Sequence, residues 1–138
     1  MKKKELLTVP THKNDEIFTF VKYRFNVTDM LKRMSLGEIR YKEQSAPITE
    51  WAEKVLILDR GKPDARPMSF FMRIDYSHLQ KIDNDRLEVP IVMAVTKMGA
   101  IIVDGNHRVA KAYLQGIDSL PCRVICETTT TKLLRQYR

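Results

Sequence analysis

The sequence Ala100-Ile101-Ile102-Val103-Asp104-Gly105-Asn106-His107-Arg108 carries the strongest structural signal in the chain. Four apolar residues lead into a glycine-containing turn, and the pattern from Val109 to Gln115 indicates a helix. The first N–H groups of a helix lack acceptors, and the helix dipole is positive at that end. A turn that also carries His107 and Arg108 is therefore suited to holding an anion, and phosphate is the expected one.

The segments on either side of this turn predict a small sheet. Ile91 to Thr96 and Ala100 to Val103 are rich in β-forming residues and are joined by Lys97-Met98-Gly99, so they should form an antiparallel hairpin. The following helix should end at Gly116, because glycine is common at helix C-termini. Leu120 to Ile125 supplies a third strand. The residues that this helix is expected to bury are Val109, Ala110, Tyr113 and Leu114.

Weaker patterns precede residue 90. Ile17 to Phe25 has apolar residues at alternate positions and is predicted to be one strand. Thr28 is expected to cap a short helix from Asp29 to Met34. We further expect strands at 39–44 and 69–75, helices at 48–58 and 76–82, and a loop at 59–67.

The length of 138 residues predicts one domain. We expect a flexible basic N-terminus at 1–14, the folded domain at 15–127 and a basic C-terminal tail at 128–138 that begins with a polar linker. No apolar run approaches the roughly 20 residues that a membrane span requires. Because residues after Met1-Lys2-Lys3-Lys4 lack the apolar region of a secretory signal, we expect a cytoplasmic protein without membrane partners.

Charge and cysteine content add two expectations. The formal net charge of +7 favours polyanionic partners, namely nucleotides or nucleic acid, although much of the excess lies at the two ends of the chain. Cys122 and Cys126 are four residues apart in an expected strand, which separates them too far for an easy disulfide. We therefore expect two buried thiols.

The region from Leu87 to Cys126 resembles the ParB/sulfiredoxin superfamily. The resemblance lies in Val89-Pro90-Ile91-Val92-Met93, Gly99, the stretch from Val103 to Ala112 that contains Gly105-Asn106-His107-Arg108, Gly116, and Leu120-Pro121-Cys122-Arg123-Val124. It covers roughly residues 87–126. A proline-led strand, a hairpin, a G-x-H-R turn, an alanine-rich helix, a glycine and a further strand recur in this order in the family.

The resemblance implies a ParB/sulfiredoxin-like α+β fold, with a mixed sheet flanked by helices and a G-x-H-R turn that binds nucleotide phosphates of ATP, ADP or CTP. Family members reduce sulfinic acids, hydrolyse CTP, phosphorylate free serine or have reported nuclease activity, so the fold does not select one reaction. Sulfiredoxins have a catalytic cysteine where this chain has Asn106, and asparagine cannot supply a thiolate nucleophile. We expect neither a sulfiredoxin nor a full partition protein, which carries a further helix-turn-helix domain.

The residue types in the turn suggest individual roles. The backbone from Gly105 to Arg108 can stabilise charge on phosphate groups, and Arg108 offers a planar set of donors that matches phosphate oxygens. His107 either donates to a phosphate or acts as a general base. Asn106 can orient a ribose, a base or an attacking water molecule. Lys111 lies one turn after His107 and either adds a positive charge to the site or is a solvated surface lysine.

Asp104 is the one acidic residue of the turn. It either holds Mg²⁺ beside the phosphates or orients His107, or it satisfies N–H groups of the turn. Glu88 and Asp85 are weaker candidates for a second carboxylate. The sequence contains no His/Cys metal-ligand spacing, Walker-type loop or serine-hydrolase motif, so a phosphate site with hydrated Mg²⁺ fits best.

Three functions follow as hypotheses. The first is a nucleotide-binding domain that hydrolyses a nucleotide or transfers its phosphoryl group, with Asp104 and His107 as catalytic residues. The second is a nuclease that uses the same turn on a phosphodiester. The third is a non-enzymatic adaptor, of the kind that plasmids or phages encode, which binds nucleic acid or a host protein that the sequence does not identify.

Overall fold

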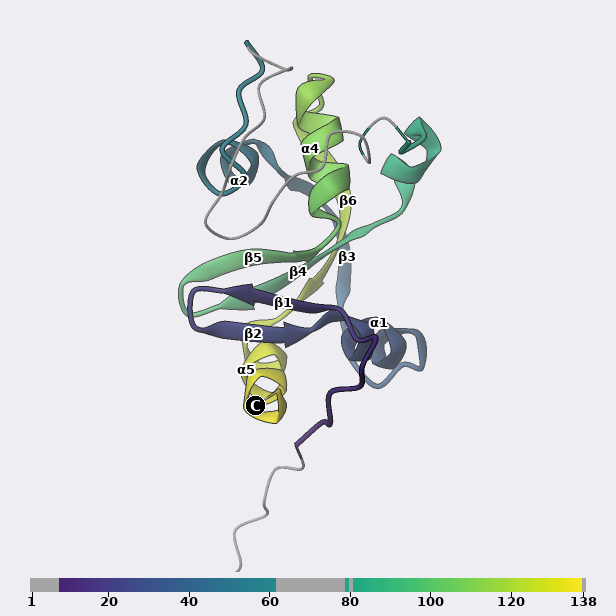
Figure 1. Ribbon diagram of the computed structural model, residues 1–138, viewed down its shortest axis with the longest axis vertical. Coiled ribbons are helices and arrows are strands. Elements are labelled where there is room, and N and C mark those ends of the chain that lie inside the picture. Colours follow the sequence, from purple (N-terminus) through teal and green to yellow (C-terminus); the bar gives the residue numbers. More distant parts are fainter. Residues whose placement is uncertain (1–7, 62–78, 80, 138) are drawn as a thin grey trace, which may run out of the picture.

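A four-stranded mixed sheet organises the chain. The computed structural model describes residues 8–61, 79 and 81–137 (Figure 1). The strands of the larger sheet are β3 (Lys42–Pro47), β4 (Ile91–Thr96), β5 (Gly99–Asp104) and β6 (Ser119–Ile125). Their spatial order is β3-β6-β4-β5, and only the β4–β6 pair is parallel. A separate hairpin consists of β1 (Ile17–Phe20) and β2 (Tyr23–Asn26).

The central strands bury side chains on both faces of this sheet. In β4, Ile91 belongs to one core cluster and its neighbour Val92 belongs to the other; in β5, Ile102 and Ile101 are divided in the same way. This division follows from the two-residue period of a strand, which sends successive side chains to opposite faces. The sheet is therefore the middle layer of the domain and needs cover on both sides.

Helices and the hairpin provide this cover. The helices are α1 (Val27–Ser35), α2 (Thr49–Lys54), α4 (Asn106–Leu114) and α5 (Glu127–Gln136), with a 3₁₀ helix η1 (Asn84–Glu88) before β4. Residues of α2 and α4 pack in one core cluster, whereas residues of the β1–β2 hairpin, α1 and α5 pack in the other. Figure 1 shows these two groups on opposite sides of the sheet. The chain is thus an α+β domain with a mixed sheet flanked by helices.

The region after residue 90 has the predicted elements. The β4–β5 hairpin is antiparallel, as expected, and α4 and β6 follow in the predicted order. Gly116, which follows the C-cap residue of α4, has φ +86°, a conformation that glycine adopts without steric cost. Val109, Ala110 and Tyr113 are buried, as the helical pattern predicted. Leu114 is half-buried and packs against the same core.

The N-terminal predictions were only partly right. Residues 17–25 do not form one strand, because the chain reverses at Val21 and Lys22, where Phe20 pairs with Tyr23. Val21 has φ +54° and is exposed. Neither turn residue is of a type that marks a hairpin turn, so the sequence pattern gave no reason to divide the strand.

Helix α1 begins earlier than predicted and has a different cap. The Asn26 side chain accepts a hydrogen bond from the Asp29 N–H at 3.0 Å, so Asn26 rather than Thr28 is the N-cap. The Thr28 hydroxyl instead accepts from the Glu16 N–H at 2.8 Å. This bond fixes the chain just before β1 and places Glu16 at the start of the hairpin.

Three further boundaries differ from the predictions. The strand expected at 39–44 is β3 at Lys42–Pro47, and the helix expected at 48–58 is reduced to α2 at Thr49–Lys54. The helix cannot continue through Ile57, which has φ +56°, although Leu56 and Leu58 still reach the core. The elements expected at 69–75 and 76–82 lie mostly outside the described residues, as does the loop from residue 62.

Residues 128–138 were expected to be a basic tail that begins with a polar linker, but most of those that the structure describes are helical. They lie in α5. Leu133 of this helix is buried in the same core cluster as Tyr137, the residue that follows the last residue of the helix. The Tyr137 hydroxyl donates to Asp29 Oδ2 at 2.5 Å and so joins α5 to α1. At the other end of the chain, the Val9 N–H donates to the Gln136 carbonyl at 3.0 Å.

The two cysteines lie in different environments. Cys122 is buried in β6, as expected, and burial raises the pKa of its thiol to about 11. Cys126 precedes α5 and is exposed, which contradicts the prediction of a buried thiol. Its thiol donates to the Thr129 hydroxyl at 3.3 Å, because β6 ends at Ile125 and the chain turns into the helix.

Candidate functional site

The predicted turn lies at the end of β5, at the start of the nine-residue helix α4. Gly105 is the N-cap of α4, with φ +98° and ψ +19°. A Cβ atom on Gly105 would lie 2.6 Å from Ile91 Cγ2, so glycine is required here both for its conformation and for space. The turn thus brings the first N–H groups of α4 close to the end of β5.

Arg108 is held on the first turn of α4 by three hydrogen bonds. Its Nη1 donates to the Val89 carbonyl at 2.7 Å and to the Pro90 carbonyl at 3.2 Å, and its Nη2 donates to Asp104 Oδ2 at 3.2 Å. Burial lowers the pKa of Arg108, an effect that the Asp104 carboxylate opposes. A guanidinium group has five N–H donors, so these bonds leave two for a ligand.

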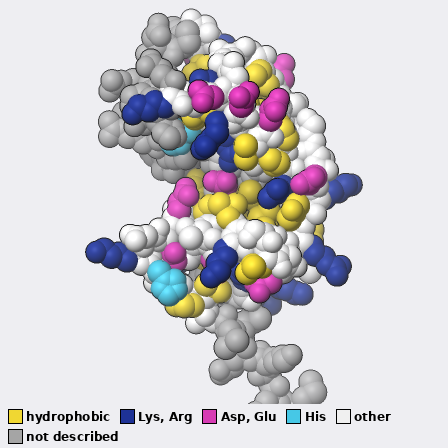
Figure 2. Space-filling view, turned by 90° about the vertical axis from the view of Figure 1, so that its right-hand side faces the viewer, with side chains coloured by type: hydrophobic (Ala, Val, Ile, Leu, Met, Phe, Trp, Pro, Cys, Tyr) yellow, Lys and Arg dark blue, Asp and Glu magenta, His cyan; other side chains and the backbone are white. Residues whose placement is uncertain are grey.

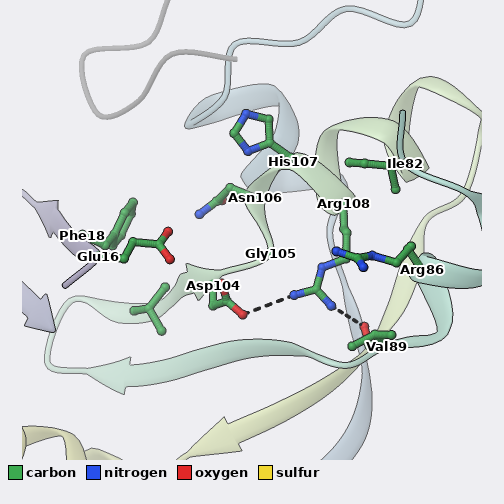
Figure 3. A pocket seen from close by; sticks show the side chains of 11 residues that line it. Glu16, Phe18, Ile82, Arg86, Val89, Asp104, Gly105, Asn106, His107 and Arg108 are labelled. Carbon is green, nitrogen blue, oxygen red and sulfur yellow. Dashed lines mark hydrogen bonds and ion pairs between the residues drawn. The ribbon is translucent and has the colours of Figure 1, made fainter. Parts of the chain in front are cut away.

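A cavity of about 500 Å³ opens beside this turn. Its volume lies within the range of small-molecule sites. The polar side chains that line it are those of Glu16, Arg86, Asp104, Asn106, His107 and Arg108. The apolar ones are those of Phe18, Ile82, Val89 and Val103. Five of the predicted site residues, from Asp104 to Arg108, therefore lie at one cavity (Figure 3).

Arg86 is a residue of this cavity that the sequence analysis did not identify. It lies on η1, is exposed, and its positive charge lowers the pKa of Arg108. Figure 3 shows the two guanidinium groups next to each other. Among the described residues, no acidic side chain forms an ion pair with Arg86. Two adjacent positive charges thus face the cavity. Arg108 forms an ion pair with Asp104, whereas Arg86 has no acidic partner among the described residues.

Glu16 supplies a second carboxylate that was also missed. It lies 88 positions before Asp104 in the sequence, at the start of the β1–β2 hairpin, which packs on the sheet. Although Glu16 is exposed overall, partial desolvation raises its pKa, and the negative charge of Asp104 raises it further. The weaker candidates Asp85 and Glu88 are exposed on η1, and neither lines the cavity.

The Asn106 side chain is held by hydrogen bonds within the protein. Its amide Nδ2 donates to the Ile102 carbonyl at 3.0 Å, and its Oδ1 accepts from Trp51 Nε1 at 2.6 Å. The residue is buried and joins α2 to the end of β5. The expected role in orienting a ribose, a base or a water molecule therefore competes with two hydrogen bonds within the protein.

We predict that Asn106→Ala lowers the free energy of unfolding by about 2 kcal/mol, because it leaves a partly buried indole N–H and a buried backbone carbonyl without their partners. Trp51 is the single tryptophan, so its fluorescence during denaturant unfolding measures both the stability and the environment of the ring. Asn84→Ala, at an exposed asparagine on η1, should change stability by less than about 0.5 kcal/mol. Equal effects of the two substitutions would contradict this role.

His107 and Lys111 differ in their relation to the cavity. His107 lines it, and Figure 3 shows the imidazole on the side away from Asp104. Lys111 does not line the cavity; its ammonium group donates to the Leu79 carbonyl at 3.1 Å. Lys111 therefore contacts the segment before η1 instead of adding its charge to the predicted site.

The distribution of charged side chains bears on two other types of site, a continuous basic surface and a metal site. On the face drawn in Figure 2, Lys and Arg side chains alternate with Asp and Glu around exposed hydrophobic side chains, so positive charge does not form one continuous surface there. In the described part of the chain, no group of three or more His, Cys, Asp or Glu residues is arranged to hold a metal ion. No helix of residues 8–61, 79 and 81–137 is long and apolar enough to cross a membrane.

The cavity therefore combines two arginines, a helix start, a histidine and two carboxylates. This combination can bind an anion and move a proton beside it. Comparisons of the chain with protein-family models, with curated proteins and with solved structures found no match.

Proposed function

We propose that the cavity at the start of α4 binds a nucleotide through its phosphate group. The observation that carries this proposal is the pair of adjacent guanidinium groups of Arg86 and Arg108, whose mutual repulsion a bound anion would relieve. The first turn of α4 lines the same cavity, and the N–H groups at a helix start favour negative charge. Gly105 has no side chain to block an approach to this backbone.

The order of elements also supports a nucleotide site. Pro90, the β4–β5 hairpin, the Gly105–Arg108 turn, α4, Gly116 and β6 follow one another along the chain. This is the order that the resemblance to the ParB/sulfiredoxin family implies, and we propose that the chain shares that fold. In this family the turn binds nucleotide phosphates.

We further propose that the site hydrolyses the nucleotide or transfers its phosphoryl group. Arg108 and the start of α4 would stabilise the negative charge that develops on the phosphate oxygens. His107 would accept the proton of the attacking group, because a neutral imidazole is a base near pH 7. Asp104, paired with Arg108, would contribute a carboxylate oxygen to a nucleotide-bound Mg²⁺, which needs few protein ligands.

Arg86→Gln tests the phosphate contact. We expect this substitution to weaken nucleotide binding about tenfold, because it removes a charged hydrogen bond to phosphate. Isothermal titration calorimetry with ATP, ADP, CTP and GTP, each with Mg²⁺, measures the effect. Arg86 is a better test than Arg108, whose side chain also holds Val89, Pro90 and Asp104 in place.

Arg135→Gln is the matched control, since Arg135 is an exposed arginine on α5 that does not line the cavity. It should leave nucleotide affinity unchanged. The absence of binding by the unsubstituted protein, or an equal loss in both variants, would refute the proposed site. Release of inorganic phosphate that His107→Ala abolishes, with binding retained, would support the catalytic step.

A further inference from the structure

The cavity has opposite charges at its two ends. Arg86 and Arg108 reach it from η1 and α4, whereas Glu16 and Phe18 reach it from the start of the β1–β2 hairpin. Figure 3 shows Glu16 and Phe18 on the side opposite the two arginines, with Asp104 and Gly105 between them. A ligand that fills the cavity therefore meets cationic groups at one end and an acidic group beside an aromatic ring at the other.

The two carboxylates at the cavity are not equivalent. Asp104 accepts a hydrogen bond from Arg108 and neutralises part of the positive charge at that end. The Glu16 carboxylate has no hydrogen-bond or ion-pair partner among the described residues, although its backbone N–H is bonded to Thr28. An ionised carboxylate only accepts hydrogen bonds, so Glu16 favours hydroxyl or amino groups and repels phosphate oxygens.

We propose that Glu16 is a specificity residue that recognises the nucleoside end of the ligand by accepting hydrogen bonds from it. The phosphate lies at Arg86 and Arg108, and the buried ring of Phe18 provides an apolar wall beside Glu16. The ligand is thereby oriented along the cavity by two charges of opposite sign. This inference rests on the proposed nucleotide site and adds the direction in which the nucleotide is bound.

A nucleoside has two kinds of donor that Glu16 can recognise. The ribose hydroxyls are one, since acidic side chains commonly accept hydrogen bonds from them in nucleotide sites. An amino group on the base is the other, since carboxylates accept from such groups as well. Both present the same chemistry to Glu16, and ligands that lack one or the other separate them.

Glu16→Gln distinguishes the two ends of the cavity. We expect it to weaken AMP binding about tenfold, because a neutral amide oxygen is a weaker acceptor than a carboxylate. Binding of inorganic phosphate should be unchanged or slightly tighter, because the substitution removes a negative charge from the same cavity. Isothermal titration calorimetry at low ionic strength in EDTA, with inorganic phosphate, AMP, IMP and 2′,3′-dideoxy-AMP, measures these affinities.

The ligand series identifies the donor. If Glu16 accepts from the ribose, the dideoxy compound binds the unsubstituted protein about as weakly as AMP binds Glu16→Gln, and IMP binds like AMP. If it accepts from the base amino group, IMP is the weak ligand. Either result supports the proposal, since each assigns a donor at the nucleoside end.

Glu88→Gln is the matched control, because it makes the same change at an exposed residue that does not line the cavity. It should alter no affinity. Thermal unfolding checks folding; Glu16→Gln should not lower the midpoint, since partial burial and Asp104 already disfavour the charged form of Glu16. Glu16→Ala provides a second variant for the same titrations.

The outcomes separate this inference from the proposed function. If the unsubstituted protein binds neither phosphate nor AMP, the nucleotide site itself is refuted. If it binds both and Glu16→Gln changes neither affinity, or weakens both equally, the site stands and the role of Glu16 is refuted. An effect of Glu16→Gln that occurs only when Mg²⁺ replaces EDTA would show that Glu16 acts through a metal ion, which also refutes it.

Discussion

Gly105→Ala is expected to lower the free energy of unfolding by about 4 kcal/mol, from backbone strain and overpacking together. Gly105 has φ +98°, which residues with a Cβ atom rarely adopt. The new methyl group would also lie 2.6 Å from Ile91 Cγ2 and 3.0 Å from Arg108 Nη2. Ile91 is fully buried and cannot move aside without disturbing the core. Urea unfolding followed by circular dichroism measures the loss.

Gly116→Ala separates the two causes of this loss. Gly116 has φ +86° just beyond the other end of α4, but a Cβ atom there would have no heavy atom within 4 Å. This control should cost only about 1 kcal/mol, from backbone strain alone. A loss at Gly105 no larger than that at Gly116 would show that the contact with Ile91 is relieved at little cost.

Leu133→Ala is expected to lower the free energy of unfolding by about 3 kcal/mol, the typical cost of a cavity in a packed core. Leu133 lies on α5 and is 2% exposed. It packs in the core cluster formed by α1, the β1–β2 hairpin and one face of the larger sheet. Thermal and urea unfolding measure the loss.

Leu36→Ala serves as the control, because Leu36 is 62% exposed at the end of α1. The free energy of unfolding of this variant should change by less than about 0.5 kcal/mol. If Leu133→Ala were as mild as this control, the packing of α5 would contribute little to the stability of the fold.

These two predictions concern opposite sides of the sheet, yet both bear on the cavity. Gly105 sets the position of the first turn of α4, which carries Arg108. The β1–β2 hairpin, which carries Phe18 and follows Glu16, packs in the same core cluster as α5. A change in either core should therefore alter ligand affinity as well as stability.

Local sequence patterns were sufficient for residues 91–125. The β4–β5 hairpin has a short glycine-containing turn, and α4 has an apolar face and a glycine directly after its end. Each of these features depends on residues a few positions apart. The strand–turn–helix arrangement around Gly105 could be predicted for this reason, and with it the presence of Asp104, His107 and Arg108 at one site.

The same patterns failed where a segment is stabilised by distant residues. Residues 128–131 are four threonines, which indicate a linker when taken alone. They become part of α5 because Leu133 and Tyr137 are buried in a core cluster that also contains Phe25 and Met30. The turn at Val21 is likewise fixed by pairing of β1 with β2 and not by its own residue types.

The sequence by itself determined the glycine turn between β5 and α4, the sheet strands beside it and the presence of asparagine rather than cysteine at position 106. Only the tertiary structure placed Glu16 and Arg86 at the same cavity, gave Arg108 its bonds to Val89 and Pro90, and directed Lys111 to Leu79. The physical reason is that hairpin, helix-cap and turn signals act over a few residues. By contrast, the proximity of Glu16 to Asp104 depends on how the β1–β2 hairpin packs on the sheet.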